Sequence, residues 1–296
     1  MKKIVSLVLS SGGARGIAHI GVIEELENRG YTIGSVSGTS MGALVGGIYA
    51  AGGLKLLKEW MLTLDRLEVF SLVDFTLTRS GMVKGEKVLK EMRKLIPDKN
   101  IEDFSIPYTA IATDIINDKE VVFDKGSLYN AIRASISIPT VFTPFEHQGV
   151  KMVDGGVINP IPLNRVKRSE NDLVVAVDVN ARIPFVSTIS KKQIAEENRI
   201  KKDKRFSKYI NLLSGRINAF IPKHEKDKLG YFNLMNKTTS LMVHQLTRQS
   251  IKQYKPDVLI NIPHQAFGTF DFYKTAEIIK MGEELTRKTL DDFENK

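Results

Sequence analysis

The chain contains no cysteine, so it forms no disulfide bond, and this composition fits a reducing compartment. It also has no apolar run of 18 residues, which excludes a membrane-spanning helix. The first apolar run, Ile4 to Leu9, is too short for a secretory signal and is expected to be a strand. The five histidines show no metal-ligand spacing, so neither a metal nor another cofactor is expected. We therefore expect a cytoplasmic protein.

Acidic residues are too few to balance the basic ones, and the formal net charge is +9. Most of the excess lies in residues 182–230, which carry 13 Lys or Arg and 5 Asp or Glu, interleaved with aromatic and aliphatic residues. This composition is typical of an amphipathic segment that seeks a surface. It favours peripheral docking on an anionic membrane, and a solvated or homo-oligomer-forming insertion stays open. No nucleic-acid motif accompanies the segment, so nucleic acid is not an expected partner.

At 296 residues and 42% apolar content, the chain can bury one large core. Periodicity predicts alternating strands and helices, hence an α/β fold with a mostly parallel sheet and helices on both faces. The expected strands lie near 3–9, 32–37, 106–113, 119–124, 150–154, 172–180 and 257–263, and the expected helices near 16–29, 41–52, 85–96, 127–136, 233–254 and 273–292. We expect a single domain over 1–296, with a core at about 3–180, a basic helical insertion at about 182–230, and a C-terminal strand and helices at about 231–296.

Ser40 lies in a G-x-S-x-G motif between a predicted strand and a predicted helix. In this context the motif indicates a nucleophile elbow, in which a tight turn presents a reactive serine. The flanking glycines allow a strained backbone and close approach of a substrate carbonyl. The following helix points its free N–H groups at the reaction site. The residues of this motif are Gly38, Thr39, Ser40, Met41 and Gly42.

A glycine-rich loop follows the first predicted strand and opens the first predicted helix. Its backbone N–H groups could bind the oxyanion of an acyl-transfer intermediate. A pyrophosphate is an alternative, although the acidic residue of a dinucleotide site is missing at the end of the second strand. A tight turn without a ligand is a third. The expected oxyanion donors come from Gly12, Gly13, Ala14, Arg15 and Gly16, with Met41 after the serine.

Asp154 ends a short β-prone run and is followed by Gly155 and Gly156. A carboxylate at a strand end, with space left by two glycines, suits a general base for a serine hydroxyl. By itself the same pattern is more often a turn.

Together, the glycine loop, the elbow and Asp154-Gly155-Gly156 occur in an order that resembles the patatin-like phospholipases, in particular their bacterial single-domain members. A segment at 133–144, with Ala134, Ser135, Pro139, Phe142 and Pro144, also resembles a motif of this family. The resemblance implies a three-layer α/β sandwich, a catalytic dyad of Ser40 and Asp154, and hydrolysis of acyl esters in lipids, as a phospholipase A, lysophospholipase or esterase.

One departure from the family is the pair Ser10 and Ser11, where glycines are usual. Two alternatives also stay open. His264 follows a predicted strand, so a triad of Ser40, Asp154 and His264 could replace the dyad. The chain could instead be a non-catalytic lipid-binding protein that retains the glycine loops. Residues 55–84 are rich in apolar side chains and predict either an acyl-chain-binding cap or ordinary helix packing.

Overall fold

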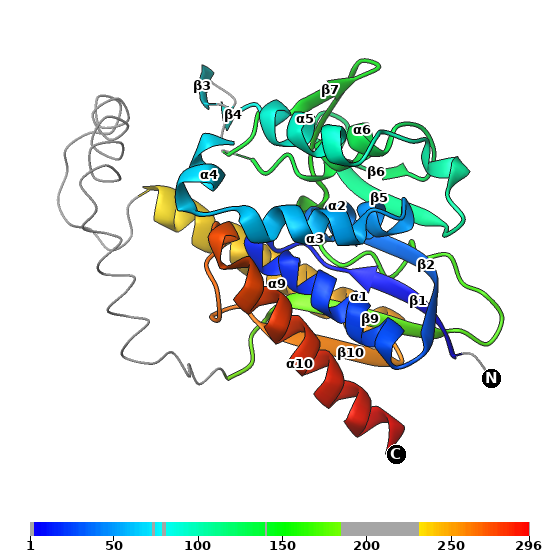
Figure 1. The fold of residues 1–296 in the computed structure, drawn as a ribbon. Coiled ribbons are helices and arrows are strands. Elements are labelled where there is room, and N and C mark those ends of the chain that lie inside the picture. The colour runs from blue at the N-terminus through cyan, green and yellow to red at the C-terminus, as the bar shows by residue number, and fades with distance from the viewer. Residues whose placement is uncertain (1–2, 73–74, 79–80, 140, 185–230, 296) are drawn as a thin grey trace. The chain divides into compact units, whose positions relative to one another are not determined.

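The computed structural model describes residues 3–72, 75–78, 81–139, 141–184 and 231–295 (Figure 1). The chain divides into two compact units, one made of Met1–Pro184 with Leu241–Lys296 and the other of Phe185–Ser240. Apart from its first three residues, the basic segment expected at 182–230 lies outside the described residues. The expectation of a single domain stays a prediction. In the described part of the chain, no helix combines the length and the apolar content needed to cross a bilayer.

The larger unit contains one eight-stranded sheet in the order β10-β9-β1-β2-β5-β8-β7, with β6 also paired to β5. The strands from β10 to β5 are parallel, and β6, β7 and β8 are antiparallel to their neighbours. The mostly parallel sheet is thus confirmed. The bounds are β1 Lys3–Leu9, β2 Tyr31–Thr39, β5 Tyr108–Asp114, β6 Lys119–Phe123, β7 Phe145–His147, β8 Val150–Asp154, β9 Leu173–Ala181 and β10 Val258–Pro263.

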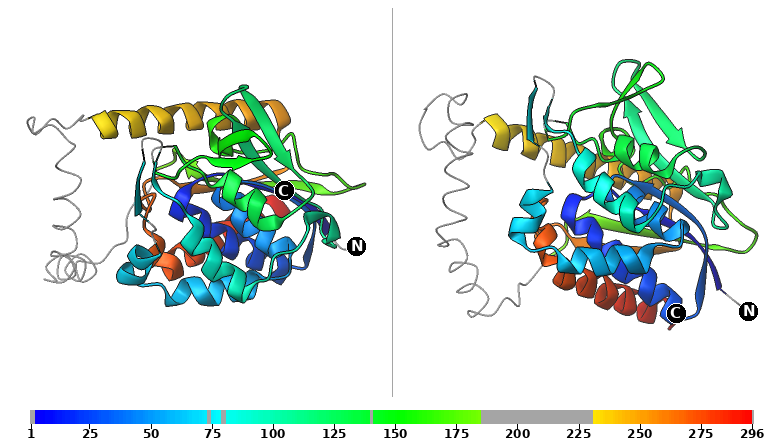
Figure 2. Two further views of the ribbon diagram at one scale, coloured as in Figure 1. Left: turned by 90° about the horizontal axis from the view of Figure 1, so that it is seen from above. Right: turned by 45° about the horizontal axis from the view of Figure 1, so that its top comes forward.

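Helices cover both faces of this sheet (Figure 2). On one face lie α1, α2 and α10, together with most of the hydrophobic core. On the other, Ile251 of α9 packs against a smaller cluster that includes Val8, Val174 and Ala176. The three-layer α/β sandwich is therefore confirmed. The helices are α1 Ala18–Asn28, α2 Met41–Ala50, α3 Leu54–Thr63, α4 Arg66–Ser71, α5 Glu86–Leu95, α6 Leu128–Ser135, α9 Tyr231–Tyr254 and α10 Thr275–Glu294.

Strand β1 shows why the strands can be read from the sequence. Its side chains are buried on both faces: Val5, Leu7 and Leu9 face the large core, and Val8 faces the small one. A continuous apolar run is what a central parallel strand requires. Every strand and helix expected from the sequence is present, with its ends shifted by at most two residues. The structure also contains elements that were not expected separately from the sequence: α3, α4, the β3–β4 hairpin (Phe75–Thr78 and Gly81–Val83) and the three-residue β7.

The C-terminal helix α10 packs against α1 backbone to backbone. A Cβ added at Gly21 would lie 2.1 Å from the carbonyl oxygen of Ile279, and one at Gly282 would lie 2.1 Å from that of Ala18. Both positions therefore need glycine, because no side chain can turn away from a backbone atom so close.

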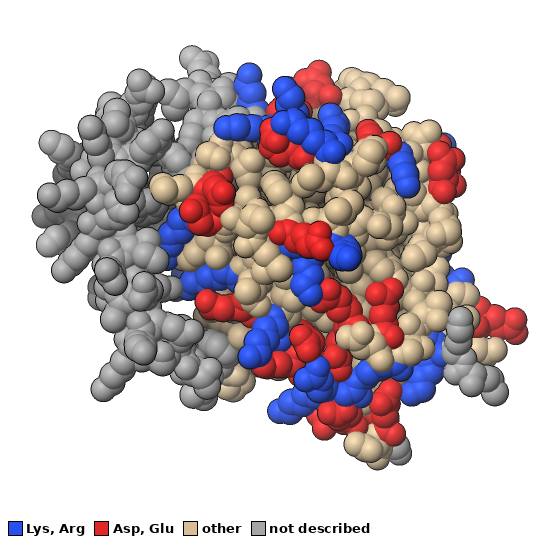
Figure 3. All heavy atoms as spheres, in the orientation of Figure 1, with Lys and Arg blue, Asp and Glu red and all other residues tan. Residues whose placement is uncertain are grey.

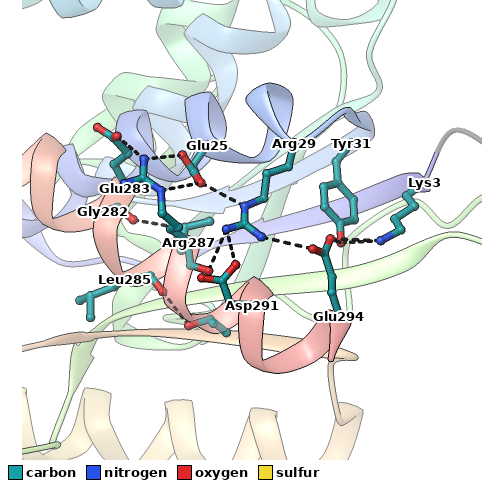
Figure 4. A network of polar contacts seen from close by, with 12 residues as sticks. Lys3, Glu25, Arg29, Tyr31, Gly282, Glu283, Leu285, Arg287, Asp291 and Glu294 are labelled. Carbon is teal, nitrogen blue, oxygen red and sulfur yellow. Dashed lines mark hydrogen bonds and ion pairs between the residues drawn. The ribbon is translucent and has the colours of Figure 1, made fainter. Parts of the chain in front are cut away.

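Charged side chains complete the contact between α1 and α10 (Figure 4). The buried carboxylate of Glu25 accepts hydrogen bonds from Arg29 (3.1 Å) and, through both of its oxygens, from Arg287 (3.1 Å each). Burial opposes ionisation of Glu25, but the two arginines outweigh it and lower its pKa. Near the chain end, Glu294 accepts from Lys3 and Tyr31. These contacts fix α10 to the first residues of β1 and β2. Basic and acidic side chains intermix over this surface (Figure 3).

We expect Gly21→Ala to lower the free energy of unfolding by at least about 2 kcal/mol, even after alanine's helix-propensity gain of roughly 1 kcal/mol, because the helices must separate. Chemical denaturation measures this. Gly30→Ala is the control: Gly30 has φ of 79° and nothing within 4 Å of an added Cβ, so only the backbone cost of about 1 kcal/mol applies. A smaller loss at Gly21 than at Gly30 would contradict the packing described.

Candidate active site

Ser40 is the single residue between a strand and a helix. Strand β2 ends at Thr39, α2 begins at Met41, and Ser40 joins them with φ of 57° and ψ of −121°. A non-glycine residue with positive φ is uncommon and holds strain of order 1–3 kcal/mol. The sequence motif thus adopts the sharp strand-to-helix turn of a nucleophile elbow.

The two glycines of this motif are required sterically. A Cβ at Gly38 would lie 2.4 Å from the carbonyl carbon and oxygen of Gly42, and a Cβ at Gly42 would lie 2.2 Å from the carbonyl oxygen of Leu9. These contacts are with backbone, so no rotamer relieves them. The elbow therefore packs against the end of β1 in a way that only glycine at both positions permits.

Ser135, at the end of α6, holds the elbow in place through hydrogen bonds. Its fully buried hydroxyl accepts a hydrogen bond from the N–H of Ser40 (2.8 Å) and donates one to the carbonyl of Ile111 in β5 (2.6 Å). In the sequence, Ser135 stands within a motif that resembles the family, but the motif assigns it no role. Its place in that motif was the only sequence signal that it matters. The contact itself could not be read from the sequence, because Ser135 and Ser40 are 95 residues apart.

Strand β5 brings Asp154 to the elbow. The first half of β5 pairs with β2, where Thr39 lies opposite Ile111. Its second half pairs with β8, where Asp154 lies opposite Ala112. Because β2 is parallel to β5 and β8 is antiparallel, the two strands end facing one another at adjacent positions of β5. Ser40 and Asp154, 114 positions apart in the sequence, are thereby brought together.

The carboxyl of Asp154 is only 4% exposed. Burial raises its pKa to about 6, although the hydroxyl of Ser40 and the N–H of Gly156 act to lower it. Its Oδ1 accepts from Gly156 (2.7 Å), while its buried Oδ2 has no hydrogen bond of ordinary geometry within the described residues. Near neutral pH this group is therefore a carboxylate with one free oxygen and the ability to accept a proton.

The glycines after Asp154 have separate structural reasons. A Cβ at Gly155 would lie 2.2 Å from the carbonyl oxygen of Ile111, so β8 can reach β5 only with glycine there. A Cβ at Gly156 would lie 3.0 Å from Oδ1 of Asp154 and 3.1 Å from the hydroxyl of Ser11. Glycine at 156 therefore lets the backbone N–H approach the carboxylate.

The glycine-rich loop between β1 and α1 forms a short 3-10 helix, Gly13–Ile17. Gly13 has φ of 56°. Among the described residues, the N–H groups of Gly12 and Gly13 have no acceptor. The N–H of Ala14 differs from our expectation, because it already donates to the carbonyl of Thr269 (2.9 Å). In this conformation Gly12 and Gly13 are thus the available donors of the loop.

Arg15 and Gly16, which were expected among the oxyanion donors, hold the loop in position. The half-buried side chain of Arg15 donates to the carbonyl of Val179 (3.2 Å) and to the side chain of Asn180 (2.8 Å), which fixes the loop to the end of β9. A Cβ at Gly16 would lie 2.5 Å from the side chain of Met41. The loop therefore packs directly on the first residue of α2, whose N–H, at a helix start, has no intrahelical partner.

The serines that replace the family's usual glycines tie the loop to its neighbours. The hydroxyl of Ser10 accepts from the N–H of Val179 (3.0 Å), and the N–H of Ser11 donates to the carbonyl of Pro160 (2.8 Å). The Nε2 of His19 lies 2.9 Å from the carbonyl of Ser10. Burial lowers the pKa of His19 to about 4, so it stays neutral and has a structural role.

The structure does not bring His264 to the dyad. His264 follows β10, which is separated from β2 by β9 and β1, a distance of roughly 14 Å at the usual spacing of strands. Its N–H donates to the carbonyl of Ala181. Within the described residues, neither Ser40 nor Asp154 has a hydrogen bond to a histidine, so this geometry does not support a triad through His264.

Other strand-end aspartates have different surroundings. Asp114 accepts hydrogen bonds from Asn117 and from the N–H of Ile116, and these lower its pKa although burial acts to raise it. Asp178 is buried, which raises its pKa to about 6, and it accepts from the N–H of Asn180 (2.9 Å). Asp114 therefore closes a turn, and Asp178 lies next to the glycine-rich loop.

An apolar cavity of about 150 Å³ opens at Ser40. Its wall comes from α2, α3, α4 and α5, with Phe272 near the glycine loop, and nearly all of the lining is apolar. Trp60 and Met61 of α3 and Leu64 directly after it contribute, so the apolar region expected at 55–84 lines a cavity next to the serine. The described residues contain no group of three or more His, Cys, Asp or Glu placed to hold a metal ion.

The chain is similar to known proteins of one family. The model of the family described as patatin-like phospholipase matches residues 7–166. An uncharacterized NTE family protein of Mycobacterium tuberculosis is 32% identical over 98% of this chain and 92% of its own length. The lysophospholipase NTE1 of Candida glabrata is 27% identical over 94% of this chain, which corresponds to 15% of that protein. VipD from Legionella pneumophila aligns with a TM-score of 0.45 at 15% identity, over 99% of this chain and 67% of VipD.

Because the pKa of Asp154 is raised from 3.8 to about 6, the folded state binds this proton more tightly than the unfolded state. The carboxyl's contribution to stability is full below about pH 4 and is lost as pH rises through 6. We therefore expect Asp154→Asn to raise the free energy of unfolding at pH 8, by up to about 3 kcal/mol, and to change it little at pH 4. Denaturation at both pH values measures this.

Asp114→Asn is the matched control for this experiment. The pKa of Asp114 is lowered, so its ionised form stabilises the fold and its replacement should destabilise the protein at pH 8. The same sign of effect for both variants would show that burial of Asp154 is not the cause.

Proposed function

The chain belongs to the patatin-like phospholipase family, and from that premise we propose that it is a serine acyl hydrolase that cleaves carboxylic esters of lipids. One observation supports this above all: Ser40 and Asp154 meet at adjacent positions of β5, beside two free loop N–H groups and an apolar cavity. These are the parts that acyl transfer from a lipid requires.

In the proposed mechanism, Asp154 accepts the proton of the Ser40 hydroxyl while the Oγ attacks the ester carbonyl. The N–H groups of Gly12, Gly13 and Met41, which have no acceptor of their own among the described residues, stabilise the oxyanion of the tetrahedral intermediate by donating hydrogen bonds to it. Protonated Asp154 then gives its proton to the leaving alcohol, and an acyl-enzyme remains. Asp154 next deprotonates water, which attacks the acyl-enzyme. As the second tetrahedral intermediate collapses, protonated Asp154 returns this proton to the Oγ of Ser40, and a fatty acid and free Ser40 are released.

The elbow's strained backbone fits this role. A positive φ at Ser40 persists only because the sheet, Ser135 and two glycines over-determine it. The catalytic groups are therefore held in place before substrate arrives, so little reorganisation is needed during the reaction.

The substrate class is supported by the cavity and by the relatives. A lining that is nearly all apolar suits an acyl chain and leaves polar parts of the substrate outside. The Candida glabrata relative is a lysophospholipase by name. We therefore propose a phospholipase A, lysophospholipase or esterase specificity, and the absence of cysteine accords with a cytoplasmic location.

A serine-directed probe distinguishes a serine hydrolase from the alternative, a non-catalytic lipid-binding protein. We expect a fluorophosphonate to label the protein at Ser40 and hydrolysis of a chromogenic ester to fall at least a hundredfold in Ser40→Ala, because the attacking atom is lost. Mass spectrometry locates the label. Ser250→Ala is the control, since that hydroxyl donates to the carbonyl of Ile161 away from the site. Activity retained in Ser40→Ala would show that another group attacks.

The pH dependence tests the base. With the pKa of Asp154 at about 6, kcat/KM for a small ester should rise tenfold per pH unit below that value and level off above it. His264→Ala should leave the level and the midpoint unchanged. His19, with its pKa near 4, would place the midpoint about two units lower.

Asp178 needs its own control in this experiment, because its pKa is also about 6. We expect Asp178→Asn to retain the midpoint and Asp154→Asn to lose most activity at every pH. The opposite result would assign the titration to Asp178 and overturn the proposed dyad.

A further inference from the structure

We propose that the cavity at Ser40 admits a medium-length acyl chain of roughly six to eight carbons, and that Met92 with Leu57 forms the wall that limits its length. This inference rests on the proposed function, because it assigns the acyl group that the serine would receive. It concerns the far end of the cavity, which takes no part in the chemistry.

The cavity runs between two helices that meet at one end. A Cβ at Gly53, which precedes α3, would lie 3.0 Å from Cγ2 of Ile96, which follows α5. The start of α3 thus lies against the end of α5. One helical turn inward from this contact are Leu57 and Met92, both lining the cavity and both only 1% exposed. This pair therefore closes the cavity.

The other end of the same helix pair faces the reactive groups. Arg66 of α4, which follows α3, stacks on the ring of Tyr273 at 4.0 Å. The segment containing Tyr273 also holds the glycine loop, because the carbonyl of Thr269 accepts from the N–H of Ala14. Leu64 and Gly85, at the opposite ends of α3 and α5 from the wall, line the cavity on this side. An acyl chain would enter here, beside Ser40.

The depth of the cavity follows from helix geometry. Seven residues separate Leu57 from Leu64, and seven separate Gly85 from Met92. At 1.5 Å per residue each wall is roughly 10 Å long. An extended chain advances roughly 1.2 Å per single bond, so about eight bonds span this length.

The volume leads to a similar value. A cavity of about 150 Å³ opens at Ser40, and an aliphatic cavity of similar size in another protein accommodates the six carbons of benzene. A long acyl chain of 16 carbons therefore exceeds the space available without movement of the wall. Met92 is the residue most suited to set the limit, since its unbranched side chain fills the end and its removal opens it.

The test is the chain-length profile of hydrolysis, measured as kcat/KM for p-nitrophenyl esters from acetate to palmitate. We expect the wild type to peak at six to eight carbons. Met92→Ala should move the optimum at least two carbons longer and raise the ratio of dodecanoate to hexanoate activity at least tenfold, since each buried methylene contributes roughly fourfold. Leu57→Phe should move the optimum shorter.

Leu89→Ala is the matched control. Leu89 lies on the same helix and is equally buried, at 1% exposure, yet does not line the cavity. Leu89→Ala should lower the free energy of unfolding as much as Met92→Ala does, but it should leave the shape of the chain-length profile unchanged. A profile that peaks at palmitate, or one that shifts as far in Leu89→Ala as in Met92→Ala, would overturn the assignment.

Binding to Ser40→Ala separates this inference from the proposed function. Neutral primary alcohols from hexanol to dodecanol need no nucleophile, and calorimetry can rank them. A preference for hexanol and octanol that moves to longer alcohols in the Ser40→Ala, Met92→Ala double variant supports the wall even if no ester is hydrolysed. Binding that ignores chain length in both variants would refute the wall, whatever the catalytic result.

Discussion

The active site depends on one constraint, the sharing of a single edge of β5 by two strands that run in opposite directions. Strand β2 occupies the first half of this edge and β8 the second half, so that Thr39 lies opposite Ile111 and Asp154 opposite Ala112. The hydrogen-bond register therefore sets the position of Asp154 relative to Ser40. A slip of this register by one residue would turn every side chain of the strand to the other face. The Ser135 hydroxyl strengthens this junction by bonding both Ile111 and the backbone of Ser40.

Two features of the junction oppose stability and favour function. Ser40 keeps a positive φ, and Asp154 is buried with a raised pKa and one oxygen without a regular partner. Glu25 shows the opposite arrangement at the α1–α10 contact, where two arginines lower the pKa of a buried carboxylate (Figure 4). The reason is that the charge of Glu25 is neutralised by two arginines, whereas Asp154 has no basic partner among the described residues and keeps an oxygen that can accept a proton. Groups of the second kind cluster at functional sites.

The cavity beside Ser40 is lined mainly by helices rather than by strands. Helices α3 and α5 come from a part of the chain between the elbow and β5, and several of their apolar residues line the cavity. Their convergence at Gly53 and Ile96 closes one end, and the glycine loop lies at the other. The proposed reaction and the proposed choice of acyl group therefore rest on different layers of the fold.

The sequence by itself determined the elements and the chemical groups, because both depend on local patterns. Buried runs such as Lys3–Leu9 predict parallel strands, and the glycines around Ser40 and after Asp154 indicate where backbone must approach backbone. What it left open were contacts between distant segments. The role of Ser135, the hydrogen bond that occupies the N–H of Ala14, the separation of His264 from the serine by two intervening strands, and the closed end of the cavity at Met92 all arise from strand order and helix packing. Only the tertiary structure decided these, since residues far apart in sequence meet through registers that no local pattern specifies.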